Sequence, residues 1–173
     1  MKIACMALLG SLAATAWVQS ASAHVTLERN QAPAGSYYKA VLQVAHGCQG
    51  SPTVTVRVRI PEGVTSAKPQ PKPGWKLSIT RVPLAPPMDA GHHHGADEGV
   101  SDVVWSGGPL ADEHFDEFRI LMKLPDRPGT TLYLPVIQEC QQGELRWTGQ
   151  PTADAPAGDI KTPAPALQLT PRP

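Results

Sequence analysis

The stretch TVTVRVRI, Thr53 to Ile60, decides the fold. Apolar β-branched residues alternate in it with threonine and arginine, and a period of two predicts a strand with one face on a core and the other in water. The apolar positions are Val54, Val56, Val58 and Ile60, and the polar positions are Thr53, Thr55, Arg57 and Arg59. This segment indicates a protein built from β-sheets.

Similar short runs recur along the chain and are separated by proline, glycine or aspartate turns. The 19 prolines and 15 glycines would interrupt most long helices, so we expect little helix. The spacing predicts an all-β protein, an antiparallel β-sandwich of roughly seven to nine strands. The other runs are YKAVLQVAH (38–46), WKLSITRV (75–82), DVVWSG (102–107), FDEFRILMKLP (115–125) and TLYLPVIQEC (131–140).

The N-terminus has the three parts of a secretory signal peptide: Lys2, a mostly apolar run from Ile3 to Val18, and the small-residue site Ala21-Ser22-Ala23. A retained membrane anchor is the alternative. Cleavage after Ala23 would make His24 the first residue of a mature chain in the periplasm or outside the cell. Because no second apolar run of membrane-spanning length follows, we expect no membrane span in the mature chain.

The rest of the chain divides into a domain over residues 24–150 and a Pro/Ala-rich tail over residues 151–173. The tail shows no core pattern after Trp147, so we expect it to be disordered or loosely packed. Residues 84–101 lack periodicity and are expected to form a long loop between two strands.

Charge and motifs exclude several classes of function. Lysine plus arginine number 15 and aspartate plus glutamate number 15, so nothing favours nucleic acid as a partner. No G-x-S-x-G elbow, phosphate loop or dinucleotide fingerprint occurs. The paired carboxylates Asp112-Glu113 and Asp116-Glu117 are interpreted as solvated surface rather than as an acid–base pair.

Of the three cysteines, Cys5 lies in the signal peptide, which leaves Cys48 and Cys140. In an exported protein, an even pair most simply forms one disulfide. A metal-binding thiol pair is the alternative, although no CxxC spacing supports it.

Histidine is the residue type that indicates a metal-binding function. A freed N-terminal His24 could chelate one ion through its α-amine and its Nδ1, and nitrogen ligands of this kind suit Cu(II). The loop MDAGHHHG, with His92, His93 and His94 beside Met88 and Asp89, could capture copper or other ions loosely; a solvated polar loop is the alternative.

An ordered series of motifs resembles the YcnI-like copper-binding domain family. It begins with SAHVTLERNQAPAGSYYKAVLQVAHGCQGSPTVTVRVRIPEGV and continues with PKPGWKL, VVWSGG, FDEFRILMKLP and RWTG, so that it extends from His24 to about Gly149. The resemblance implies an exported β-sandwich of immunoglobulin- or cupredoxin-like shape. It also implies that the processed N-terminal histidine binds Cu(II) in a histidine brace, with a carboxylate and a tryptophan nearby. The brace then falls on His24 and the tryptophan on Trp147, whereas Trp75 and Trp105 are interpreted as core residues.

The carboxylate of the family pattern has no counterpart here, because SYYK offers Tyr37, Tyr38 and Lys39 in its place. We expect His46 to replace it, since His46 lies two residues before Cys48 and would share its strand face. A strand-end histidine bonded to a backbone carbonyl is the alternative for His46. Glu28 and Glu144 are further candidate ligands.

The first functional hypothesis is a periplasmic copper carrier or metallochaperone that passes Cu(II) to other periplasmic copper chaperones or to a membrane importer. The second is a copper-dependent oxidative enzyme of the histidine-brace type. The third is a structural or adhesion β-sandwich that binds no metal.

Overall fold

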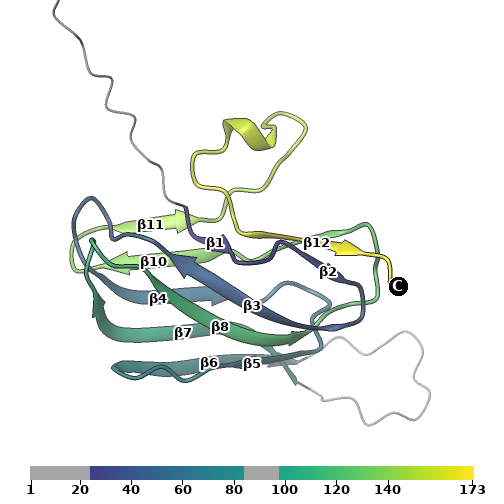
Figure 1. The fold of residues 1–173 in the computed structure, drawn as a ribbon, viewed down its shortest axis with the longest axis horizontal. Coiled ribbons are helices and arrows are strands. Elements are labelled where there is room, and N and C mark those ends of the chain that lie inside the picture. Colours follow the sequence, from purple (N-terminus) through teal and green to yellow (C-terminus); the bar gives the residue numbers. More distant parts are fainter. Residues whose placement is uncertain (1–23, 84–97) are drawn as a thin grey trace, which may run out of the picture.

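The structure is a computed structural model that describes residues 24–83 and 98–173 (Figure 1). The predicted signal peptide and the triple histidine His92 to His94 lie outside the described residues. Within them, no helix is both long enough and apolar enough to cross a membrane.

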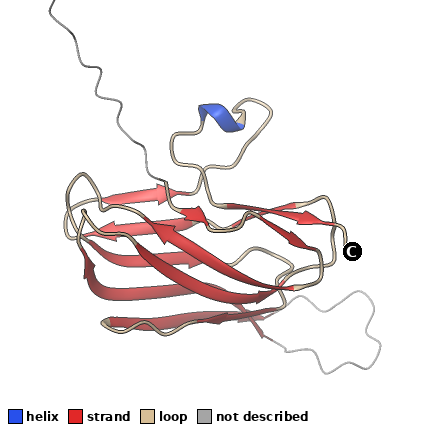
Figure 2. Ribbon diagram, viewed as in Figure 1, coloured by secondary structure: helices blue, strands red, loops and turns tan. Residues whose placement is uncertain are grey.

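The regular secondary structure of the described residues consists of strands and one short 3₁₀ helix, η1 (Ala157–Asp159) (Figure 2). All six runs predicted as strands are strands. The strands are β1 (Thr26–Leu27), β2 (Gln31–Pro33), β3 (Tyr37–Val44), β4 (Thr53–Arg59), β5 (Ser66–Pro69), β6 (Trp75–Pro83), β7 (Glu98–Leu110), β8 (Asp116–Lys123), β9 (Thr131–Tyr133), β10 (Val136–Cys140), β11 (Glu144–Trp147) and β12 (Ala166–Thr170). They exceed the expected seven to nine because several are only two to four residues long.

The strands form a β-sandwich of two main sheets with a smaller sheet at one end (Figure 1). One main sheet has the order β1-β3-β8-β5 and the other the order β11-β10-β4-β7-β6, and all their pairings are antiparallel, as predicted. The small sheet has the order β2-β12-β9. In it β12 runs parallel to β2, a departure from the predicted antiparallel pattern.

The core lies between the two main sheets and contains the inward residues that the alternation predicted. Val56, Val58 and Ile60 are buried, as is Trp105, and Trp75 packs edge-on against Phe118 with ring centroids 5.0 Å apart. The interpretation of Trp105 as a core residue is therefore confirmed, whereas Trp75 is partly buried and packs against the core.

The start of β4 departs from the predicted alternation. Thr53 is fully buried and Val54 only half-buried, although the pattern placed Val54 on the core side. The pairing of β4 with β7 shifts register between Thr53 and Thr55, and a bulge of this kind changes the face to which a side chain points. Thr53 therefore enters the interior as a polar group.

The expectation of a disordered or loosely packed tail over residues 151–173 is wrong for its last part. β12 pairs with both β2 and β9, and Leu167 and Leu169 on it are fully buried. Before β12 the chain makes an excursion whose two ends are joined at Gly149 and Pro163, and η1 lies within it (Figure 2). Proline and alanine obscured a strand in which only every second residue is a core leucine.

Candidate metal site

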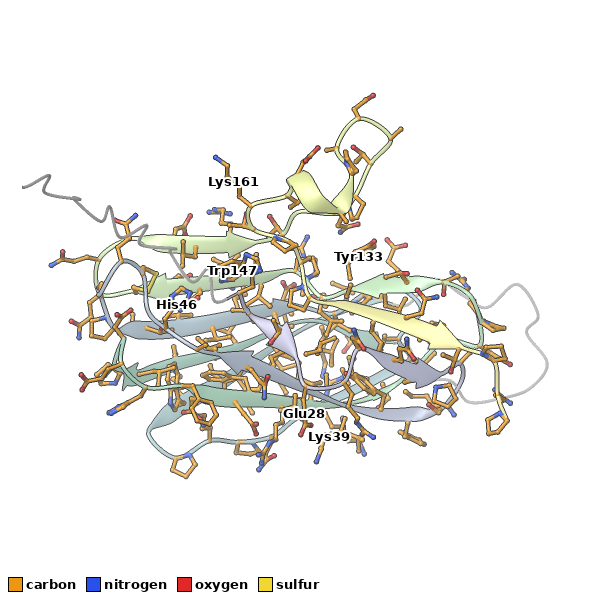
Figure 3. All side chains as sticks on the ribbon, turned by 45° about the horizontal axis from the view of Figure 1, so that its top comes forward. Glu28, Lys39, His46, Tyr133, Trp147 and Lys161 are labelled. Atoms are coloured by element: carbon orange, nitrogen blue, oxygen red, sulfur yellow. A yellow bond between two sulfur atoms is a disulfide. The ribbon has the colours of Figure 1, made fainter. Side chains whose placement is uncertain are left out.

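Trp147 lies close to both histidines that the sequence selected. Its ring centroid is 5.4 Å from that of His24 and 6.3 Å from that of His46, with both rings edge-on to the indole. Figure 3 shows His46 and Trp147 close to each other. Residues 24, 46 and 147, far apart in sequence, are thus brought to one place.

His24 reaches this place through the pairing of β1 with β3. Thr26 pairs with Gln43 and Leu27 with Leu42, so the same register continued toward the N-terminus brings His24 opposite Ala45, next to His46. Val25 is buried at 3% exposure and anchors the segment, whereas His24 itself is half-buried. The ring of His24 is therefore held on the protein while it keeps contact with solvent.

His46 follows β3 in a segment whose backbone is bound on both sides. The His46 carbonyl accepts a hydrogen bond from Gln138 Nε2 at 2.6 Å, and the Gly47 N–H donates to Asp112 Oδ1 at 2.8 Å. His46 Nδ1 contacts the Gly47 carbonyl, and because a carbonyl only accepts, Nδ1 carries the proton. This contact leaves Nε2 as the ring nitrogen that could bind a metal, a common arrangement for histidines that ligate metals.

The predicted disulfide is present. Cys48 and Cys140 are joined with their Cα atoms 6.0 Å apart, and each is buried. Cys48 lies two residues after His46, and Cys140 lies at the end of β10, which pairs with β11 and so with the strand of Trp147. The cross-link therefore holds the His46 segment against the sheet that carries Trp147.

Trp147 is 3% exposed, and its Nε1–H donates to Gln138 Oε1 at 3.0 Å. Sequence reasoning did not select Gln138, Asp112 or Thr53. One signal was available for Gln138, because it occupies a core position between Val136 and Cys140 on an otherwise apolar face. A buried amide at such a position implies nearby polar partners.

The two carboxylates considered as further ligands lie differently. Glu144 falls on the opposite face of β11 from Trp147, and it accepts from Arg146 Nε at 2.6 Å. Glu28 lies near Lys39, apart from His46 and Trp147 (Figure 3). The structure therefore brings His46, and neither glutamate, to Trp147 and His24.

The donor set decides which metal would fit. Among residues 24–83 and 98–173, no group of three or more His, Cys, Asp and Glu side chains is placed so that it could hold a metal ion. His24 and His46 supply two imidazoles, and a third nitrogen becomes available only where His24 carries a free α-amine. Imidazole and amine nitrogens suit Cu(II), which stands at the top of the divalent affinity order.

Of the two acidic pairs, Asp116-Glu117 is engaged away from the histidines. Asp116 accepts from Lys72 Nζ at 2.6 Å, and Glu117 pairs with Arg119. These two ion pairs line a pocket of about 370 Å³, and neither His24 nor His46 lines it. Asp112 instead supports Gly47 in the His46 segment.

One described side chain has a strongly shifted pKa. Burial raises the pKa of Tyr38 from 10.0 to about 12, and the phenol donates a hydrogen bond to the Arg29 carbonyl. Tyr38 occupies part of the SYYK stretch that lacks the family carboxylate. Its neutral, buried phenol has a structural role there.

Comparisons with known proteins agree with this fold. Residues 24–169 match the model of a family described as a domain of unknown function, DUF1775. The chain is 29% identical over 155 residues to the copper-binding protein CutI of Bacillus subtilis strain 168, and the alignment covers 88% of this chain and 67% of that protein. Its fold is similar to that of a Nocardia farcinica protein with an immunoglobulin-like fold, with a TM-score of 0.64 and 24% identity over 85% of this chain and 98% of the other. The chain belongs to the DUF1775 family, which is the YcnI-like family that its motifs indicated.

Proposed function

We propose that this protein is exported, is cleaved after Ala23, and binds Cu(II) through the α-amine and Nδ1 of His24 together with Nε2 of His46. The observation that carries the proposal is the meeting of His24 and His46 at Trp147, within 5.4 Å and 6.3 Å of its ring. The relative CutI is named a copper-binding protein, which supports copper as the metal.

The chemistry of the ligands supports the same metal and a processed terminus. Two histidines alone make a weak site, whereas an amine and Nδ1 from one residue close a chelate ring and add a third nitrogen. The α-amine has a reference pKa of about 8, so replacing its proton with copper near neutral pH costs little free energy. Trp147 would stand beside the ion and limit access from its side of the site.

We propose transport or delivery of copper rather than catalysis. His24 precedes β1, and Trp147 ends β11, and these two strands are the edges of the two main sheets. An ion held where two sheet edges meet can be approached by another protein without opening the core. Periplasmic copper chaperones or a membrane copper importer would be partners of the required kind.

The test is electron paramagnetic resonance with one equivalent of Cu(II). The mature protein beginning at His24 is compared with a version that carries one extra alanine before His24, and we expect different hyperfine values because the added residue removes the amine from its position. Identical spectra for the two would refute ligation by the terminal amine.

The contribution of His46 is tested separately. His46→Gln should weaken Cu(II) binding, whereas the control His114→Gln, at a side chain that is 68% exposed, should not. Cu(II) should quench tryptophan fluorescence less in Trp147→Phe than in the wild-type protein, and this difference would place the ion near the Trp147 indole. Mass spectrometry of the exported protein checks that its first residue is His24.

A further inference from the structure

Gln138 is unusual because it is a primary amide in the interior of a β-sandwich. It is 1% exposed, and it and Thr53 are the buried polar residues of the described chain. Burying an amide without partners is costly, so such a residue is retained where hydrogen bonds compensate for lost water. Its neighbours on the inward face of β10 are Val136 and Cys140.

The partners of Gln138 determine how its amide is oriented. An indole Nε1–H only donates and a backbone carbonyl only accepts. Oε1 must therefore face Trp147, from which it accepts at 3.0 Å, and Nε2 must face His46, to whose carbonyl it donates at 2.6 Å. Nε2 also donates to Thr53 Oγ1 at 2.7 Å, and the Thr53 hydroxyl lies 3.9 Å from Cys140 Sγ.

We propose that Gln138 is a positioning residue of the copper site, which fixes Trp147 and His46 relative to each other through one buried amide. This inference rests on the proposed function of His24 and His46. Gln138 is not itself a ligand, because both ends of its amide are occupied by Trp147, His46 and Thr53. It connects the β11 side of the site to the segment that follows β3.

The geometry explains why glutamine is required. Glutamate would still accept from Trp147, but an ionised carboxylate would face the His46 carbonyl with no proton to donate. Methionine would fill a similar volume but would leave the Trp147 Nε1–H and the His46 carbonyl without this partner. In either case the link from Trp147 through residue 138 to the His46 carbonyl would be broken.

The main test is Gln138→Met in the mature protein, with Gln168→Met as the matched control. Gln168 lies on β12, where its Oε1 accepts from Thr131 at 2.9 Å, in a different sheet from Trp147. We expect Gln138→Met to weaken Cu(II) affinity about tenfold and to change the hyperfine values, as residues that orient metal ligands commonly do. The control should leave both unchanged.

A metal-free measurement tests the positioning directly. The nuclear magnetic resonance signal of the Trp147 Nε1–H should shift upfield in Gln138→Met, and its exchange with solvent should speed up, because it has lost its acceptor. Should Gln138→Met not fold, Thr53→Val replaces it. That variant removes one of the two acceptors of Gln138 Nε2, and we expect faster indole exchange and roughly threefold weaker Cu(II) binding.

The outcomes separate this inference from the proposed function. Wild-type protein that binds Cu(II) through His24, together with a folded Gln138→Met variant of equal affinity and identical spectrum, would overturn the role of Gln138 alone. Wild-type protein that does not bind Cu(II) would overturn the proposed function and, with it, the role assigned to Gln138. Loss of affinity in Gln138→Met with the control unchanged supports both.

Discussion

Removing the disulfide between Cys48 and Cys140 should destabilise the mature protein strongly. The bond joins residues separated by 92 positions, and the chain-entropy model assigns such a loop about 4.5 kcal/mol at 25 °C. A domain of about 150 residues has an unfolding entropy of about 0.3 kcal/mol/K near its midpoint, so the melting temperature should fall by about 14 °C. The variant is Cys48→Ala with Cys140→Ala, which avoids placing hydroxyl groups in a buried site.

The measurement is thermal unfolding followed by circular dichroism, with and without reductant. Wild-type protein should lose stability on reduction, whereas the double variant, which has no cysteine after cleavage of the signal peptide, should not respond. A melting temperature within about 4 °C of wild type in the double variant would refute the loop-closure reasoning, because the expected entropy would then be absent from the unfolded chain.

Below its melting temperature the double variant should still bind Cu(II) with the wild-type spectrum. The His46 segment keeps the bonds of its backbone to Gln138 and to Asp112, and the Cys48 backbone still exchanges hydrogen bonds with Ser51. The disulfide then contributes stability, and the hydrogen bonds contribute the local geometry. A changed copper spectrum at low temperature would contradict this division.

Three further outcomes are expected. Leu169→Ala on β12 should lower the free energy of unfolding by about 2–5 kcal/mol in urea titrations, because it opens a cavity in place of a fully buried side chain. An effect below about 1 kcal/mol would show that β12 is only loosely packed on the domain. The free energy of unfolding should fall as pH rises from about 10 to 12, because burial raises the pKa of Tyr38 to about 12 in the folded protein and the tyrosine of the unfolded chain ionises first. Ultraviolet titration of the phenol and urea midpoints measured across this pH range check the prediction. Tyr38→Phe should make the free energy of unfolding less dependent on pH. Gly149→Ala should destabilise by about 1–3 kcal/mol, because the new Cβ would lie 2.3 Å from Ile160 Cγ2, and Ile160→Ala should restore part of the loss if that contact is the cause.

The strands were predictable because alternation is a local property. A period of two in TVTVRVRI specifies a two-faced strand whatever its neighbours are, and all six predicted runs form strands. The disulfide was predictable for a different reason, since only Cys48 and Cys140 remain after the signal peptide is set aside. The short strands β1, β2, β5 and β11 carry only two to four residues, which are too few to show a period.

The sequence by itself therefore determined an all-β sandwich, its cysteine pair and the residues with metal-binding chemistry. Only the tertiary structure decided that His24, His46 and Trp147 meet, because that depends on the register of β1 on β3 and on the pairing of β11 with β10. The same long-range packing brought Gln138 to both Trp147 and His46, across 9 and 92 positions. Contacts at such separations arise from how whole strands pack, and no local pattern of residues encodes them.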